Sequence, residues 1–404
     1  MRVLICLIVA SALCSGSIAG EFEAPPAVRA SQVLPPDLLR GPGYTVDENI
    51  GSEGYFRTFT LKTEFGTYPL TTTSMLRQRV NETRILHQVG EVHGGMEFAK
   101  SLKDDIVQVP VQSIKLVTEP VQSVKNIGNG IKGKFQNAGR FLTSGRDQSV
   151  YENNAISEAT TGALKRKVAI EMGLDPYSSN PKVQKLLNSI ARARALGGVP
   201  LRVAGMAVPP VGWGLTVLRL RRDVSDDLAV KSPSELHALN NKVLKGLRVH
   251  EEWREEFLDN KHYSPRHKTE LVANLEAMKN VPGLENFLLI AIPDASEEEA
   301  VSTVECSEMF LYFHKEVESF REINLFGNVP IGITKSNRAV VLMPLDFGFW
   351  NERAAEFCTK LAQLPCCREA RSREFLFKGE LTPAARENIS KLGFNVRDNY
   401  NGSN

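Results

Sequence analysis

The stretch SEEEAVSTVECSEMFLYFHKEVESF, residues 296–320, decides the fold of the C-terminal half. Ser296 with Glu299 three positions later is a capping box, which marks the start of a helix. Beyond it, Val301, Val304 and Leu311 fall on one side of a helix, and a second apolar set falls on another side: Cys306, Phe310, Phe313, Val317 and Phe320. A helix that is apolar on two sides is usually buried. We therefore expect a central core helix from Ser296 to about Phe320.

Downstream of this helix, short apolar runs alternate with helical patterns. The predicted order is strand 329–334, turn 335–338, strand 339–345, helix 351–364, strand 374–378, helix 382–392 and a closing segment 394–396. Strands interleaved with helices are typical of a layered α/β arrangement. The C-terminal end is therefore expected to form a small α/β layer.

Upstream, helix starts are marked by Ser232-Pro233-Ser234-Glu235 and by Ser264-Pro265, and Asn180-Pro181 opens an earlier helix. Nearer the N-terminus, residues 56–65 alternate apolar and polar side chains, and Gly66 turns the chain into residues 67–72, which predicts a β-hairpin. A long helix is expected over residues 73–107. The fold class is therefore mixed α+β and helix-rich, with an N-terminal β-hairpin, a helical middle and a C-terminal α/β layer.

The chain is 404 residues long, which exceeds what a single hydrophobic core usually supports. We expect five consecutive parts: a signal peptide at 1–19, a flexible lead at 20–54, the β-hairpin with a long helix and a cationic helix at 55–146, a helical middle at 147–230 and a C-terminal helical and α/β domain at 231–404.

The first residues have the layout of a secretory signal peptide. Arg2 is followed by an apolar run to Cys14 and by small residues that end at Ala19, where cleavage is expected. The bulky Leu13 before Cys14 disfavours a lipid-attachment site. The prediction is an exported protein, periplasmic or secreted, that is peripheral to a membrane if it contacts one.

Four cysteines remain after such a cleavage: Cys306, Cys358, Cys366 and Cys367. In an oxidising compartment an even number suggests up to two disulfides, with three connectivities. We expect Cys366 or Cys367 to pair with Cys358 or Cys306. A zinc site is the weaker alternative, because the chain has no C-x-x-C pattern, and no metal site is predicted.

Residues 120–143, PVQSVKNIGNGIKGKFQNAGRFLT, form a cationic amphipathic helical pattern. Between residues 108 and 146 six cations face one anion, a net charge of +5. Cations beside an apolar stripe suit a helix lying at a membrane surface. The residues expected to make this contact are Lys125, Ile131, Lys132, Lys134, Phe135 and Arg140. The leading hypothesis is therefore a non-enzymatic envelope protein whose partner is an anionic membrane surface or another envelope protein.

The overall charge argues against nucleic acid as a partner, because 49 Lys and Arg nearly balance 47 Asp and Glu. Residues 128–133 match G-x-G-x-x-G, but they lie within a helical pattern and follow no strand, so no nucleotide cofactor is expected. Asp346-Phe347-Gly348 matches a kinase tripeptide without its companion motifs, and we interpret it as the end of a buried strand.

The alternative hypothesis is a secreted hydrolase that uses the polar residues between 250 and 267. His250, Glu251, His262 and His267 are residue types of acid–base or metal chemistry. The same residues also fit a solvated helix surface that runs into a capped turn, and this second interpretation is favoured.

Four phrases resemble those of exported bacterial proteins of unassigned function. They are GLDPYSSNPKVQKLL at 173–187, FLDNKHYSPRHKTELVANLEAM at 257–278, VVLMPLDFGFW at 340–350 and FKGELTPAARENISKLGFNV at 377–396. The resemblance implies export to a bacterial envelope and assigns no activity and no functional residue.

Overall fold

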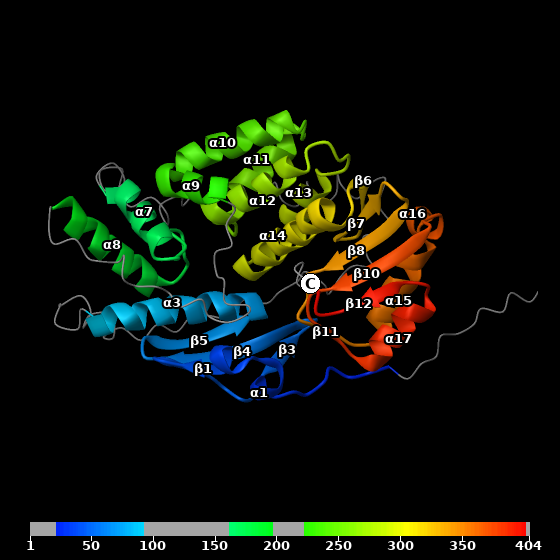
Figure 1. Ribbon diagram of the computed structural model, residues 1–404, viewed down its shortest axis with the longest axis horizontal. Helices are drawn as coiled ribbons and strands as arrows, with labels where there is room; N and C mark the ends of the chain where they lie inside the picture. The colour runs from blue at the N-terminus through cyan, green and yellow to red at the C-terminus, as the bar shows by residue number, and fades with distance from the viewer. Residues whose placement is uncertain (1–21, 93–160, 197–221, 401–404) are drawn as a thin grey trace, which may run out of the picture.

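The computed structural model describes residues 22–92, 161–196 and 222–400. Several predictions fall outside these residues: the signal peptide at 1–19, the cationic helix at 120–143 and its contact residues Lys125, Ile131, Lys132, Lys134, Phe135 and Arg140. They stay predictions. The described residues confirm the fold class, because an N-terminal antiparallel sheet, a helical middle and a C-terminal sheet follow one another along the chain (Figure 1).

The N-terminal sheet is built around one long strand. Its strands are β1 (Arg40–Gly41), β2 (Tyr44–Val46), β3 (Gly51–Glu53), β4 (Phe56–Thr63) and β5 (Gly66–Thr71). The predicted hairpin is confirmed as β4 and β5, which pair antiparallel along their length. On its other edge, β4 pairs with β2 at one end and with β3 at the other.

The segment expected to be a flexible lead is folded from residue 30 onward, which corrects that prediction. It forms the short helices α1 (Ala30–Val33) and α2 (Pro36–Leu39) and the strands β1 to β3. Leu34 and Leu38 are buried in one core with Phe59 and Leu61 of β4. The proline, alanine and serine content suggested mobility, whereas apolar residues of this segment complete the core.

Helix α3 (Thr73–Val92) lies on this sheet and connects it to the next helices. Leu76 and Val80 pack against the sheet, while Leu86 and Val89 join a second core with α7 (Ala163–Glu171) and α8 (Pro181–Ala195). The predicted long helix is confirmed over residues 73–92. The predicted cap of α8 is confirmed as well, because the Asn180 side chain accepts a hydrogen bond from the Lys182 N–H.

Six more helices follow α8 among the described residues before the C-terminal sheet begins. They are α9 (Arg222–Val230), α10 (Pro233–Gly246), α11 (Glu251–Asp259), α12 (Pro265–Ala277), α13 (Asn286–Ala291) and α14 (Glu297–Tyr312). All three predicted serine caps are confirmed, since Ser232, Ser264 and Ser296 each accept from the backbone N–H three residues later. Hydroxyl groups at these positions satisfy N–H groups that the helix itself leaves open.

The C-terminal sheet has five strands: β6 (Phe320–Phe326), β7 (Val329–Thr334), β8 (Arg338–Met343), β10 (Ser372–Phe377) and β12 (Asn395–Arg397). Their spatial order is β12-β10-β8-β7-β6. The strands β12, β10 and β8 run parallel, and β7 and β6 continue antiparallel. A separate pair, β9 (Phe347–Gly348) and β11 (Glu380–Leu381), runs parallel.

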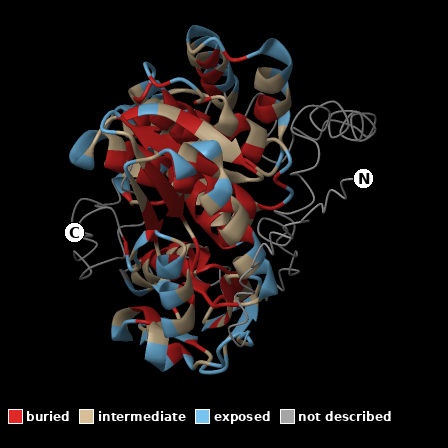
Figure 2. Cartoon of the chain, turned by 90° about the vertical axis from the view of Figure 1, so that its right-hand side faces the viewer, coloured by how far each residue is buried: buried red, intermediate tan, exposed pale blue. Residues whose placement is uncertain are grey.

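Helices cover both faces of this sheet, which agrees with the α/β layer expected for the C-terminal end. Val340 and Leu342 of β8 face the core that contains α12 to α14. Val341 and Met343 face the opposite core, which contains α15 (Glu352–Gln363), α16 (Pro365–Arg368) and α17 (Pro383–Lys391). Alternate residues of a strand point to opposite faces, which explains the continuous apolar run. Figure 2 shows buried residues in the sheets and on the inner faces of the helices.

The central helix is shorter than predicted. The α-helix ends at Tyr312, a π-helical turn spans Phe313–Val317, and Phe320 begins β6 instead of ending the helix. The ring of Phe320 nevertheless stays in the same core, stacked on Phe313 with centroids 5.2 Å apart. The apolar position was therefore identified correctly, but its secondary structure was wrong.

Hydrogen bonds to Asp346 connect the N-terminal sheet and the start of α3 to the C-terminal half. Its buried carboxylate accepts hydrogen bonds from the Arg57 N–H at 3.0 Å and from the Thr73 N–H at 3.0 and 3.1 Å. Beside it, the Phe347 N–H donates to the Tyr55 carbonyl. In the described part of the chain, no helix combines the length and apolar character needed to span a membrane.

Candidate functional site

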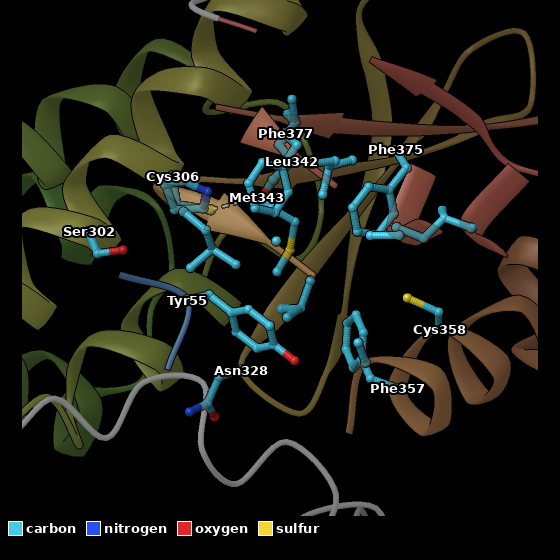
Figure 3. Close-up of a pocket in the computed structure, with 18 of the residues that line it drawn as sticks. Tyr55, Ser302, Cys306, Asn328, Leu342, Met343, Phe357, Cys358, Phe375 and Phe377 are labelled. Carbon is cyan, nitrogen blue, oxygen red and sulfur yellow. Dashed lines mark hydrogen bonds between the residues drawn. The ribbon is translucent and has the colours of Figure 1, made fainter. Parts of the chain in front are cut away.

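An apolar pocket lies where the parallel strands β8 and β10 end (Figure 3). Met343 and Phe377 are paired at the carboxyl ends of these strands, and Val329 and Pro330 enter from the start of β7. Ligand sites of layered α/β folds are found at the carboxyl ends of parallel strands. The position in the fold is therefore one where a ligand site is expected.

The walls of the pocket come from elements far apart in the sequence. Helix α14 contributes Ser302, Thr303 and Cys306, and further residues come from α15, α17 and the N-terminal sheet: Ala354, Phe357, Cys358, Ala385, Ile389 and Tyr55. The cavity volume is about 90 Å³. A mostly apolar lining with a few polar groups is typical of small-molecule sites.

Two polar atoms in the pocket wall lack hydrogen-bond partners among the described residues. They are the Ser302 hydroxyl and the indole Nε1 of Trp350. Both side chains are almost fully enclosed, with 2% of Ser302 and 0% of Trp350 exposed. A buried polar group without a partner costs about 1–3 kcal/mol. An acceptor atom on a ligand would recover that cost.

Tyr55 carries a polar group at one side of the pocket (Figure 3). Its hydroxyl donates to Asn351 Oδ1 at 3.1 Å, and the same oxygen caps α15 by accepting from the Ala354 N–H at 2.8 Å. Burial raises the pKa of Tyr55 to about 12, so the phenol stays neutral at physiological pH. Arg353, an exposed cation, also borders the pocket.

Two of the four cysteines expected in disulfides line this pocket, and all four are free thiols in the structure. Cys306 and Cys358 lie on opposite sides of the pocket in Figure 3, and burial raises the pKa of both thiols, that of Cys358 to about 12. Cys366 differs, because a hydrogen bond from the Cys367 thiol lowers its pKa to about 7. The disulfide pairings stay predictions.

The candidate residues of the hydrolase hypothesis occupy different environments. His250 is exposed at the start of α11, and Glu251 is an exposed partner of Arg254 at 3.9 Å. His262 is half-buried, and desolvation lowers its pKa. His267 is buried, and desolvation lowers its pKa to about 3, which keeps it neutral.

No hydrogen bond or ion pair of the described chain joins any two of His250, Glu251, His262 and His267. Among the described residues there is also no group of three or more His, Cys, Asp or Glu side chains placed to hold a metal ion. The hydrolase site in this region therefore stays a prediction without a contact that supports it.

Comparisons with known proteins assign no family to the chain. No family model, no curated protein and no solved structure matches it.

Sequence reasoning missed the pocket. Its lining residues are apolar side chains that look like ordinary core positions in the sequence. The one available signal was Ser302, a hydroxyl beside Val301 in the helix we expected to be buried. The sequence alone does not separate Ser302 from Ser307, a buried serine of the same helix that is fully hydrogen-bonded.

Proposed function

We propose that this protein binds a small, mostly apolar ligand that carries a hydrogen-bond acceptor, in the pocket between α14, α15 and the ends of β8 and β10. The observation that carries the proposal is the pair of buried, unpartnered donors in a mostly apolar wall, Ser302 Oγ and Trp350 Nε1. Apolar surface would provide most of the affinity, and the donors would select ligands with a carbonyl or ether oxygen.

A pair of matched probes tests this proposal. 2-Acetylnaphthalene has an apolar ring system and one carbonyl acceptor, whereas naphthalene has the rings alone. By isothermal titration calorimetry on the full chain, we expect one site per chain for the ketone. Its affinity should exceed that of naphthalene about 5- to 10-fold, because one net hydrogen bond is worth about 1 kcal/mol.

The variant Ala354→Phe would obstruct the pocket, and Ala355→Phe is its matched control. Both alanines are partly buried neighbours on α15, but only Ala354 lines the pocket. Binding should be lost in the first variant and retained in the second. The proposal fails if neither probe binds the full chain, or if the two variants lose binding equally while both remain folded by circular dichroism.

A second candidate function is association of an exported protein with an anionic membrane surface. It is supported by the cationic apolar stripe of residues 120–143, with six cations against one anion between residues 108 and 146. Co-sedimentation with vesicles that contain phosphatidylglycerol should occur and should weaken with salt. Changing Lys125, Lys132 and Lys134 to Glu should abolish it, and unchanged sedimentation would exclude this role for the stripe.

A further inference from the structure

Three polar side chains from separate parts of the chain meet beside α14, outside the pocket. Ser74 comes from the first turn of α3, Glu305 from α14 and Lys378 from the residue after β10. The Ser74 hydroxyl donates to Glu305 Oε1 at 2.5 Å, and the Lys378 ammonium donates to Ser74 Oγ at 2.7 Å. Lys378 also donates to the second oxygen of Glu305 at 2.6 Å. The three groups form a closed triangle.

Ser74 follows a strained turn between a strand and a helix. Strand β5 ends at Thr71, Thr72 has a φ of 76°, and α3 begins at Thr73. A positive φ on a β-branched residue is unusual and strained. It persists because the Thr72 N–H donates to the Arg57 carbonyl, the Met75 N–H donates to Thr72 Oγ1, and Asp346 accepts from Thr73. The position of Ser74 is therefore fixed from several directions.

The hydrogen bonds leave the serine oxygen able to react. Ser74 Oγ gives one hydrogen bond and accepts one, so one lone pair is still available. The backbone N–H of Ser74 has no acceptor among the described residues, whereas those of Thr73, Met75 and Leu76 are bonded. The cluster is also accessible to solvent, since 20% of the Lys378 side chain and 23% of the Glu305 side chain are exposed.

The hydrogen bonds of Lys378 decide its role. Its ammonium group donates to Ser74 Oγ and to Glu305 Oε2. A group that donates to both neighbours is placed to act as a cation and not as a base. Glu305 is the group placed to accept the serine proton.

We infer that Ser74, Glu305 and Lys378 form a nucleophilic site for acyl transfer from small esters to water. Ser74 Oγ attacks the ester carbon while its proton passes to Glu305. Lys378 and the free Ser74 N–H stabilise the negative charge on the carbonyl oxygen. The alcohol leaves with the proton from Glu305, and an acyl-serine forms. A water then gives its proton to Glu305 and attacks the acyl group, which releases the acid and returns the proton to Ser74.

This site is independent of the proposed ligand pocket, because none of its three residues lines that pocket. A purely structural ion pair between Lys378 and Glu305 would not make the serine react with an electrophile. Covalent labelling therefore distinguishes the two roles.

The test is labelling of the full chain with a biotinylated fluorophosphonate, followed by peptide mass mapping. We expect one adduct, on Ser74, and slow hydrolysis of p-nitrophenyl acetate. Ser74→Ala should abolish both, and Ser52→Ala, an exposed serine on β3, should change neither. Glu305→Gln should slow labelling about 100-fold or more, while Glu305→Asp should retain part of the rate.

The result that overturns the inference needs no variant: a folded wild-type chain without an adduct on Ser74. It would also be overturned if Ser74→Ala hydrolysed the ester at the wild-type rate. Equal labelling of Glu305→Gln and wild type would remove Glu305 from its assigned role. Each of these outcomes is independent of whether 2-acetylnaphthalene binds.

Discussion

Two buried serines on different sides of helix α14 differ in their hydrogen bonding. Ser307, which is 0% exposed, accepts from Asn274 of α12 at 3.0 Å and donates to the Val304 carbonyl at 2.6 Å. Ser302, which is 2% exposed, faces the pocket and has no partner in the described chain. The residue type, the helix and the degree of burial are the same.

The difference shows where the protein itself supplies hydrogen-bond partners for a buried hydroxyl group and where it does not. Protein interiors rarely leave buried polar groups unpaired, so an exception indicates a role. Packing between α12 and α14 satisfies Ser307, whereas the hydroxyl of Ser302, a residue that lines the pocket, has no partner in the described chain. Substitutions of Asp294, Ser307 and Ser302 test this contrast.

The largest effect on stability is expected for a substitution of Asp294, a buried residue that is hydrogen-bonded to the pocket wall. Its carboxyl accepts from the Tyr263 hydroxyl at 2.5 Å and from Thr303 Oγ1, on the pocket wall, at 2.9 Å. Burial raises the pKa of Asp294 from 3.8 to about 8. The unfolded chain therefore loses this proton at lower pH than the folded chain, and stability should fall as pH rises from about 4 to about 8.

Asp294→Asn should remove this part of the pH dependence, because the amide oxygen still accepts a hydrogen bond and does not ionise. The difference in free energy of unfolding between variant and wild type should grow from pH 5 to pH 8 in favour of the variant. Over these three pH units the upper limit is about 4 kcal/mol, since one pH unit between the two pKa values is worth about 1.4 kcal/mol. Urea titrations at pH 5, 6.5 and 8 measure it.

The control for this experiment is Asp226→Asn, a change of an exposed carboxylate on α9. It should leave the pH dependence of unfolding as in wild type. Parallel stability curves for wild type and Asp294→Asn would contradict the assignment of a buried, protonated Asp294.

Ser307→Ala should have an intermediate effect. The substitution leaves the buried amide of Asn274 without the acceptor it now uses. We expect a loss of about 1–3 kcal/mol in the free energy of unfolding, measured by urea titration. Stability equal to wild type would show that Asn274 finds another acceptor and that this side of α14 is less constrained than its contacts indicate.

The smallest effect is expected for Ser302→Ala. Removing a buried hydroxyl that has no partner should leave the unliganded protein unchanged or more stable by up to about 1 kcal/mol. The same variant should bind 2-acetylnaphthalene less well than wild type, while its affinity for naphthalene stays the same. A loss of stability as large as that of Ser307→Ala would show that the two serines are equivalent and would end the contrast.

Much of the fold could be predicted from the sequence because its signals are local. Serine caps at 232, 264 and 296 and the apolar runs of β7 and β8 depend only on neighbouring residues. Strand β6 was missed because Phe320 continues the helical spacing of Phe313 and Val317. The folded lead was missed because Leu34 and Leu38 share a core with residues that come later in the chain, among them Phe59 and Leu61 of β4.

The candidate sites could not be predicted, because they depend on contacts distant in sequence. Glu305 is 231 positions from Ser74, and Asn351 is 296 positions from Tyr55. No spacing rule within a single sequence links such residues. The polar cluster at 250–267 attracted attention because its members are close in sequence, yet His250 and His267 lie in different surroundings.

The contact between Asp346 and the N-terminal sheet has a consequence for the order of folding during synthesis. Asp346 is 289 positions after Arg57, and its carboxylate accepts a hydrogen bond from the Arg57 N–H. Ribosomes add about 5–20 residues per second, so the sheet emerges well before its partner. Until then the Arg57 and Thr73 N–H groups bond to water and the strained turn at Thr72 lacks its support. The hydrogen bonds of the N-terminal sheet to Asp346 can therefore be completed only after most of the chain has been made.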